Sequence, residues 1–412
     1  MRIVVTGTSG NVGTALLRRL HATADHELVG VVRRPPKPVG VYEGVQWHSV
    51  DVAEDDAADR LRPILDGADA VVHLAWGFQP TRNIKYLERQ GVGGTTAVLK
   101  AADAVSAGHL LHMSSVGTYA PGRYGTPVDE SWSTAGIATS PYSRHKAAAE
   151  SLLDDYERTK ADTGVPITRM RPGFIVQRAA ASGLMRYALP GYVPMRLVPL
   201  LPVLPLDRAL CIPLIHSDDV AAAFASAIER RATGPFNLAA EPPVTRDEVA
   251  EALRAKALHV PSGVLGALVD IAWRVRLQPI DRGWLDMAFS VPLLDCSRAR
   301  TELDWRPRWA ATAALADVLE GVGQEAHTES APLRRRSLIE QFQRDLALGS
   351  LTTRRLRRSP ALGVGPHVSG ASCYRSASAP AGGYSAPAYL PCSTASSTSA
   401  IAQRLSSVDN MS

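Results

Sequence analysis

The segment SPYSRHKAAAE places a tyrosine and a lysine four residues apart, at Tyr142 and Lys146. Residues with this spacing on an α-helix lie one turn apart on the same face. A free tyrosine titrates at a pH of about 10, so it accepts a proton at neutral pH only when a nearby positive charge stabilises the tyrosinate. A lysine ammonium can supply that charge. The pair therefore predicts a proton-transfer site, and the alternative is two solvated residues on a surface turn.

The use of lysine at this position is informative because the chain strongly prefers arginine, with six lysines against 39 arginines. Arg144 stands two residues before Lys146, so the composition does not require an ammonium here. A compact ammonium can donate hydrogen bonds to ribose hydroxyls while it lies beside a tyrosine, which a planar guanidinium does poorly. We therefore expect Lys146 to contact both Tyr142 and a bound ribose.

A glycine-rich segment, VVTGTSGNVGTALLRRL, joins the first apolar run to the first helical pattern. Glycines at such a joint allow a tight turn, close approach to a pyrophosphate and close packing of helix on strand. The N-terminus of the helix offers unpaired N–H groups and the positive end of its dipole. We expect a dinucleotide's phosphates to bind here, against the alternative of a plain glycine-rich turn. The predicted contacts are Gly7, Ser9, Gly10, Asn11, Val12 and Gly13.

The end of the second expected strand, GVVRRPP, bears on the choice of cofactor. An acidic residue at this place accepts a hydrogen bond from the ribose 2′-hydroxyl and favours NAD. The chain has Arg33 and Arg34 there instead, and two guanidinium groups suit a 2′-phosphate. The sequence thus favours NADP, with NAD left open, and Arg34 also fits a solvated strand end.

The elements that must position these residues alternate between apolar runs and helical patterns. The expected strands cover residues 2–7, 26–34, 44–52, 68–76, 109–115 and 166–175. Continuously apolar strands separated by helices predict a parallel sheet covered on both faces. Ligands in such sheets bind at the carboxyl ends of the strands. The expected fold class is α/β, with a Rossmann-type doubly wound parallel sheet, a smaller C-terminal substrate lobe and a disordered tail.

The chain divides by composition into four expected parts. They are a dinucleotide-binding core at 1–175, a substrate lobe interleaved with it at 176–325, a basic linker at 326–358, and a Ser/Ala/Pro-rich tail at 359–412. The tail has too few apolar residues to offset the entropy of ordering, so we expect it to be disordered.

Two helix starts are expected inside the lobe. Thr245 with Glu248 three residues later predicts a capping box. The segment PLIHSDDVAAAF predicts a strand followed by a helix that begins with Ser217 or Asp218 as its N-cap.

Charge and composition exclude several classes of protein. The net charge of +5 arises in residues 331–412, where ten arginines face three acidic residues, which leaves −2 for the rest, so we do not expect the folded part as a whole to be a polyanion-binding surface. The most apolar stretch, 189–206, is broken by five prolines and an arginine and cannot form a spanning helix. The four cysteines have no metal-ligand spacing, and no basic-then-apolar leader precedes the first strand. We expect a cytoplasmic protein with no metal site and no nucleic-acid partner.

The T-G-x-x-G-x-x-G spacing from Thr6 to Gly13, together with the Tyr142–Lys146 pair, resembles the extended branch of the short-chain dehydrogenase/reductase superfamily, the NAD-dependent epimerase/dehydratase family. The resemblance covers roughly residues 1–320. It implies further cofactor contacts at Asp51 and Val52 beside the adenine, at Leu74, Ala75 and Trp76 of the fourth strand end, and at Pro172.

The same resemblance implies a third catalytic residue in the segment LHMSSVGTYAP. In the family a Ser-Ser pair ends the fifth strand, and its second serine hydrogen-bonds the reacting oxygen. Ser115 matches that serine, which implies a catalytic set of Ser115, Tyr142 and Lys146. Ser114 and Tyr119 are expected to be structural or to line the substrate site. Asp219 and His216, in a segment that resembles the family's HVDDVA, are expected to be structural.

Two positions depart from the family pattern. The family commonly has an asparagine before the serine strand, where this chain has Gly91, and Trp76 replaces a small residue. Glycine has no side chain to join a proton relay, so we expect a relay through water alone or a reduced or lost activity.

The sequence as a whole predicts an NAD(P)-dependent oxidoreductase or epimerase. The substrate alternatives are a nucleotide sugar and a small apolar carbonyl or hydroxyl compound. The alternative from another class is a non-catalytic regulator that binds NADP(H) and senses redox state. A homodimer through the helix that carries Tyr142 and Lys146 is left open by the resemblance.

Overall fold

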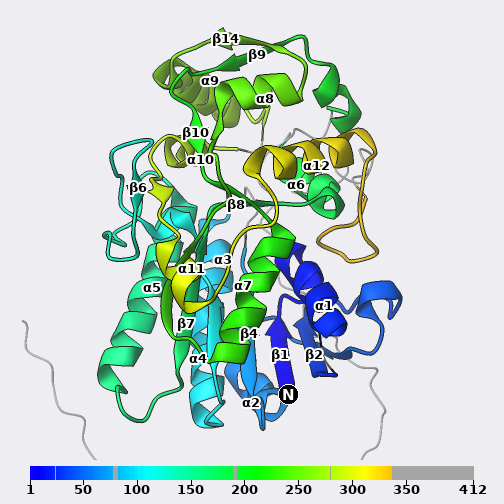
Figure 1. Cartoon of the computed structure of the whole chain (residues 1–412), viewed down its shortest axis with the longest axis vertical. Coiled ribbons are helices and arrows are strands. Elements are labelled where there is room, and N and C mark those ends of the chain that lie inside the picture. The colour runs from blue at the N-terminus through cyan, green and yellow to red at the C-terminus, as the bar shows by residue number, and fades with distance from the viewer. Residues whose placement is uncertain (24, 78–81, 189–192, 279, 336–412) are drawn as a thin grey trace, which may run out of the picture. The chain divides into compact units, whose positions relative to one another are not determined.

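The computed structural model describes residues 1–335 except 24, 78–81, 189–192 and 279 (Figure 1). These residues belong to one compact unit, Met1–Arg355. The expected tail at 359–412 and most of the expected basic linker lie outside the described residues.

A seven-stranded parallel sheet forms the centre of this unit, with strand order β12-β7-β5-β4-β1-β2-β3. The strands are β1 (Arg2–Thr6), β2 (Glu27–Val32), β3 (Gln46–Ser49), β4 (Ala70–His73), β5 (Leu110–Met113), β7 (Ile167–Pro172) and β12 (Gly234–Leu238). The order reverses at β1, as in a doubly wound fold. The Rossmann-type parallel sheet expected from the sequence is therefore confirmed.

Helices cover both faces of the sheet because its strands are apolar on both sides. On β1, Ile3 and Val5 pack into one core with helices α1 (Asn11–Thr23) and α7 (Ser217–Arg230). Val4 points to the opposite face, into a second core with the helices named next. These helices are α2 (Ala57–Leu65), α4 (Gly94–Ala104) and α5 (Pro141–Thr159). The buried interior of this layered core holds the strand ends in place.

The remaining elements build the lobe and the connections. The further helices are α3 (Ile84–Glu88), α6 (Ala181–Ala188), α8 (Arg246–Ala252), α9 (Ser262–Arg274), α10 (Arg282–Ala288), α11 (Ser297–Glu302) and α12 (Ala311–Gly323). Short helical turns are η1 (Gly40–Tyr42), η2 (Arg89–Gly93), η3 (Val116–Thr118), η4 (Arg178–Ala180) and η5 (Met195–Leu200). Four two-stranded pairs complete the described chain: β8 (Phe174–Val176) with β11 (Leu214–His216), β9 (Val203–Leu206) with β14 (Lys256–His259), β10 (Cys211–Ile212) with β13 (Val244–Thr245), and β6 (Pro127–Val128) with β15 (Leu293–Leu294).

The two expected helix starts had different outcomes. Thr245 forms the predicted capping box with Glu248 at the start of α8. At α7 the predicted cap is wrong, because His216 is the N-cap and its Nδ1 accepts a hydrogen bond from the Asp218 N–H at 3.2 Å. Asp219 instead accepts hydrogen bonds from the N–H groups of Arg308 and Trp309 at 2.9 and 3.1 Å.

The last described residues, 326–335, lie on the folded unit. Ser330 and Leu333 are buried. The Ala326 carbonyl accepts a hydrogen bond from the Ser182 N–H at 3.1 Å, and Thr328 Oγ1 lies 3.2 Å from Tyr42 Oη. The first part of the expected linker is thus packed against the core.

Among the described residues, no helix is both long enough and apolar enough to cross a membrane. No group of three or more His, Cys, Asp or Glu side chains is close enough there to hold a metal ion.

Candidate active site

The turn between β1 and α1 can be made only with glycine. Gly7 has a left-handed φ of 72°, and its N–H donates to the Val31 carbonyl at 2.9 Å. A Cβ at this residue would lie 2.7 Å from the Ala75 backbone nitrogen. Gly13, in the first turn of α1, is equally restricted, since its Cβ would lie 2.3 Å from the Thr8 carbonyl oxygen. The turn therefore brings the α1 N-terminus against the ends of β1 and β4.

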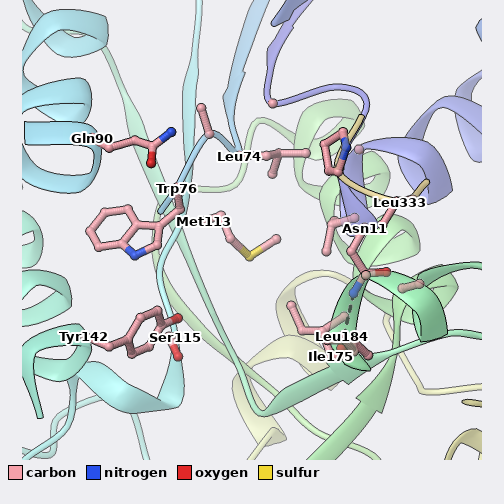
Figure 2. A pocket seen from close by; sticks show the side chains of 18 of the residues that line it. Asn11, Leu74, Trp76, Gln90, Met113, Ser115, Tyr142, Ile175, Leu184 and Leu333 are labelled. Atoms are coloured by element: carbon pink, nitrogen blue, oxygen red, sulfur yellow. Dashed lines mark hydrogen bonds between the residues drawn. The ribbon is translucent and has the colours of Figure 1, made fainter. Parts of the chain in front are cut away.

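One cavity of about 1320 Å³ runs along this turn and the carboxyl ends of the strands. It is larger than a typical small-molecule pocket of about 300–1,000 Å³, so it has room for a dinucleotide and a second small molecule. Every residue predicted to bind cofactor or substrate lines it: Gly7, Ser9, Gly10, Asn11, Val12, Gly13, Arg33, Arg34, Asp51, Val52, Leu74, Ala75, Trp76, Ser115, Tyr142, Lys146 and Pro172. Figure 2 shows Trp76, Ser115 and Tyr142 on one side of this cavity, with Leu74 and Asn11 on the other.

Asn11 has a structural task in addition to its place at the cavity wall. Its side chain donates to the Ile175 carbonyl at 3.2 Å and accepts from Gln177 Nε2 and Ser217 Oγ at 2.7 and 2.8 Å. These bonds join the N-terminus of α1 to strand β8 and helix α7.

The end of the cavity near β2 and β3 is rich in guanidinium groups. Arg33 donates to the Tyr86 hydroxyl, and Arg34 lines the same wall. Arg60 of α2 also reaches this wall, where it is held by Glu54 Oε2 at 2.6 Å and the Ser49 carbonyl at 2.8 Å. The sequence analysis did not include Arg60, because a helix residue eleven positions beyond the strand end has no local motif that marks it.

Ser115 and Tyr142 meet beside a glycine that the sequence analysis did not single out. The Ser115 hydroxyl accepts a hydrogen bond from the Gly117 N–H at 3.0 Å. A Cβ at Gly117 would lie 3.1 Å from Tyr142 Cε1 and 3.4 Å from Ser115 Oγ. The absence of a side chain there lets the phenol ring and the serine hydroxyl approach each other at the cavity wall.

The Tyr142 ring is enclosed by two tryptophans. Its centroid lies 5.3 Å from that of Trp284 and 6.4 Å from that of Trp76. Burial raises the pKa of Tyr142 to about 12, against the opposite effect of the hydrogen bond with Ser115. Burial thus acts against the lowered pKa that the Tyr-Lys spacing predicts, because loss of water disfavours the tyrosinate.

Lys146 is among the most buried side chains of the protein. Its ammonium nitrogen donates to the Met113 carbonyl at 2.6 Å and lies 3.4 Å from the centroid of the Trp76 ring. Burial lowers its pKa well below the ordinary value of a lysine, with the Glu150 carboxylate acting in the opposite direction. The cation–π contact with Trp76 and the carbonyl bond hold the side chain at the cavity wall.

The two departures from the family pattern, Gly91 and Trp76, form one structural feature. A Cβ at Gly91 would lie 2.9 Å from both Cζ2 and Cη2 of the Trp76 indole. The indole thus takes up the space next to Gly91, inside the irregular helical turn η2. A side chain at residue 91 and a tryptophan at residue 76 exclude each other.

A buried ion cluster supports the helix that carries Tyr142 and Lys146. Glu150 accepts hydrogen bonds from Ser114, Arg169 and Arg171, and the Arg171 Nε and Nη2 bonds are both 2.9 Å long. Burial by itself would raise the pKa of Glu150, but the bonds and charges of Arg171 and Arg169 and the bond from Ser114 lower it to about 2. The Ser114 hydroxyl thus bonds a structural partner, Glu150. The Tyr119 hydroxyl also bonds the protein itself, since it donates to Asn237 Oδ1 at 2.7 Å.

A sequence model described as "NAD dependent epimerase/dehydratase family" matches residues 3–239. The uncharacterized protein Rv2047c of Mycobacterium tuberculosis is 26% identical over 341 residues, which cover 81% of this chain and 32% of that protein. This chain therefore spans about a third of the length of that relative. An L-arabinose 1-dehydrogenase (NAD(P)(+)) of Haloferax volcanii is 32% identical over 114 residues, covering 28% of this chain and 41% of that enzyme.

Solved structures share the fold at low identity. UDP-glucuronic acid 4-epimerase from Bacillus cereus in complex with NAD has a TM-score of 0.58 at 17% identity, covering 79% of this chain and 99% of that chain. The dTDP-glucose 4,6-dehydratase DesIV from Streptomyces venezuelae, with NAD and TYD bound, has a TM-score of 0.59 at 20% identity, covering 79% and 97%. At these identities the likeness concerns the fold alone.

Proposed function

The chain belongs to the NAD dependent epimerase/dehydratase family, and from this premise we propose that it is an NAD(P)-dependent oxidoreductase acting on a carbonyl or hydroxyl group. The observation that carries the proposal is the convergence of Ser115, Tyr142 and Lys146 with the glycine turn on the wall of one cavity. A bound nicotinamide would supply hydride transfer at that wall.

Ser115 and Tyr142 would act on the substrate oxygen. The Ser115 hydroxyl would orient that oxygen by a hydrogen bond, and the Tyr142 hydroxyl would exchange a proton with it. Lys146 would donate hydrogen bonds to the ribose next to the nicotinamide and favour the ionised form of Tyr142.

Burial sets how much stabilisation the ionised form of Tyr142 needs during the reaction. With a pKa of about 12, Tyr142 carries its proton at neutral pH. Lowering that pKa to about 7 would need about 7 kcal/mol of stabilisation of the tyrosinate, at about 1.4 kcal/mol per unit. Proton donation to a carbonyl oxygen and proton removal from a hydroxyl group both involve the tyrosinate, so positive charge beside Tyr142 would be needed in either direction.

The wall beyond Tyr142 suits an apolar substrate. Its side chains are mostly aliphatic or aromatic: Phe174, Leu184, Met185, Val269, Ile280, Trp284, Leu285, Met287 and Leu333. Arg186 lines this wall too, but its guanidinium donates to the carbonyls of Ala331, Pro332 and Arg334. Because most of this wall is aliphatic or aromatic, an apolar carbonyl compound fits better than the diphosphate of a nucleotide sugar.

The three guanidinium groups of Arg33, Arg34 and Arg60 support NADP(H) as the preferred cofactor, since a 2′-phosphate would lie among them. Fluorescence titration of the full chain would compare NADPH with NADH. Arg34→Asp should weaken NADPH binding on the order of tenfold to a hundredfold, the value of one or two lost charged hydrogen bonds. Arg62→Asp, on the exposed face of α2, is the matched control. Tighter binding of NADH to the unchanged protein would contradict this preference.

Turnover would be measured as loss of NADPH absorbance with apolar ketones and, separately, nucleotide sugars. Tyr142→Phe should lower the rate by about 10²–10⁴ while cofactor affinity is kept. Tyr156→Phe is the control, because the Tyr156 hydroxyl bonds Asp103 and the residue does not line the cavity. Tight NADPH binding without turnover of either class would instead support the non-catalytic regulator, which the family assignment does not favour.

A further inference from the structure

Large apolar side chains exposed to solvent are concentrated in one part of the described chain. Of the thirteen such residues, ten lie between residues 197 and 277. They are Leu197, Leu200, Leu201, Val203, Leu258, Val264, Leu268, Ile271, Val275 and Leu277. Strands β9 and β14 and helix α9, which carry five of them, lie together at the end of the unit away from the sheet (Figure 1). Apolar patches of this kind mark interaction sites.

Helix α9 provides the most regular part of this patch. Val264, Leu268, Ile271 and Val275 are 50–59% exposed. Their spacing of four, three and four residues places them in one narrow stripe along the helix and its C-cap. We call these four residues the α9 surface.

The rest of α9 is not exposed aliphatic surface. Val269 lines the large cavity, Gly266 is buried, and Asp270 and Arg274 form an ion pair at 2.8 Å. The four side chains of the α9 surface are therefore the large aliphatic groups that the helix presents to solvent among the described residues.

The charges around the α9 surface are predominantly positive. Segments 197–207 and 253–277 contain four basic residues, Arg254, Lys256, Arg274 and Arg276, against two acids, Asp207 and Asp270, a net formal charge of +2. Arg254, Lys256 and Arg274 are exposed. Aliphatic side chains flanked by basic ones are the composition that lies in the interface of an anionic bilayer.

We propose that the α9 surface docks on a lipid bilayer with anionic headgroups. A second copy of the chain fits less well, because a twofold contact would place each cluster of basic residues against its own copy. The stripe also contains only Val, Leu and Ile, whereas protein interfaces are enriched in Tyr, Trp, Met and Arg. The contact needs no spanning helix and goes beyond the proposed enzyme activity.

The test is co-sedimentation of the full chain with vesicles of phosphatidylcholine alone and of phosphatidylcholine mixed with phosphatidylglycerol. Binding is expected to the mixed vesicles and to be much weaker to phosphatidylcholine alone. Leu268→Gln/Ile271→Gln keeps helix-forming residues and should lower binding at least tenfold. Lys256→Gln/Arg274→Gln should lower it about fivefold for each charge removed. Val39→Gln, at an exposed apolar residue outside the lobe, should leave binding unchanged.

Three outcomes would overturn the proposal. The first is absence of binding to the mixed vesicles. The second is unchanged binding of both α9-region variants, which would assign vesicle binding to the arginine-rich residues after 335. The third is self-association without vesicles, measured by light scattering and abolished by Leu268→Gln/Ile271→Gln, which would identify a second copy as the occupant. Circular dichroism and NADPH titration of each variant separate loss of folding or of cofactor binding from loss of docking.

Discussion

Tyr142 and Lys146 are both removed from water, and this has opposite consequences for their protons. Burial favours the neutral form of each group, which raises the pKa of the tyrosine and lowers that of the lysine. The site thus holds a protonated phenol, and proton transfer through Tyr142 in either direction requires stabilisation of the tyrosinate by a nearby positive charge.

The buried Glu150 carboxylate predicts how the free energy of unfolding depends on pH. Its pKa is about 2 in the folded chain and 4.5 in the unfolded chain. A lowered folded-state pKa contributes stability above pH 4.5 that is lost as the pH falls toward 2, about 3 kcal/mol in total. Urea unfolding between pH 5 and 2.5 should show this loss in the unchanged protein and a smaller pH dependence in Glu150→Gln.

The Gln variant is also expected to be less stable at neutral pH, because Arg169 and Arg171 lose a buried countercharge. Glu27→Gln, in a half-exposed ion pair with Arg2, is the control and should keep the pH dependence of the unchanged protein. An equal pH dependence in Glu150→Gln would show that other carboxyl groups govern acid unfolding.

A second prediction about individual residues concerns Gly91 and Trp76. Gly91→Asn should destabilise the protein by about 1–3 kcal/mol, since the new side chain overlaps the indole. In Trp76→Ala/Gly91→Asn the new side chain has room, so the combined cost should be smaller than the sum of the two single costs by about 0.5–3 kcal/mol. Denaturant midpoints of the four proteins measure this coupling. Additive costs would mean that the two residues do not share the space.

At the scale of elements, the β1–α1 turn holds a helix unusually close to a strand end. Such closeness lets backbone N–H groups reach a ligand's phosphate, and it depends on hydrogen atoms where other residues have a Cβ. Gly13 leaves the least room, because a Cβ there would lie 2.3 Å from the Thr8 carbonyl oxygen, against 2.7 Å from the Ala75 nitrogen at Gly7, and both neighbours are backbone atoms that cannot move aside as a side chain can.

Two glycine-to-alanine changes in helices test this. Gly263→Ala, in the first turn of α9 with nothing within 4 Å of the new methyl group, should raise stability by about 0.4–1 kcal/mol. Gly13→Ala, in the first turn of α1, should lower stability by more than 1 kcal/mol and weaken NADPH binding. Thermal unfolding and fluorescence titration measure both effects. If Gly13→Ala raised the stability of the protein, the turn would have room for a methyl group after all.

At the scale of the whole molecule, the cavity is closed by segments far apart in sequence. The α1 turn, the ends of β4 and β5, helices α9 and α10, and residues 331–334 all line it. The last of these lies in a stretch whose composition indicates a solvated linker. Its buried Leu333 joins the end of the described chain to the same wall as Leu184 and Asn11 (Figure 2).

Leu333→Ala should therefore lower the free energy of unfolding by about 2–5 kcal/mol, the usual cost of deleting a buried leucine side chain. Leu200→Ala is the control: Leu200 is 72% exposed, and its change should stay within about 0.5 kcal/mol. Urea denaturation measures both. Equal, small effects would mean that residues 326–335 contribute nothing to the folded unit.

The sequence by itself determined the sheet, because continuously apolar strands between amphipathic helices can be buried only as a covered parallel sheet. It also determined the glycine turn and the Tyr142–Lys146 face, since both follow from local spacing. Each predicted residue lines the cavity because strand ends and the helix N-termini beside them meet at one edge of such a sheet.

Properties that depend on residues far apart in the sequence were decided only by the tertiary structure. Whether the Tyr142 pKa rises or falls depends on Trp76, Trp284 and the depth of burial, which no local spacing encodes. The roles of Gly117, Arg60 and Leu333 arise from contacts between separate elements. The outer stripe of α9 has the apolar composition of a buried helix face, but it is exposed. Only the position of α9 in the fold shows that this stripe is not buried. Local patterns specify elements, while burial and charge at a site are properties of the packed whole.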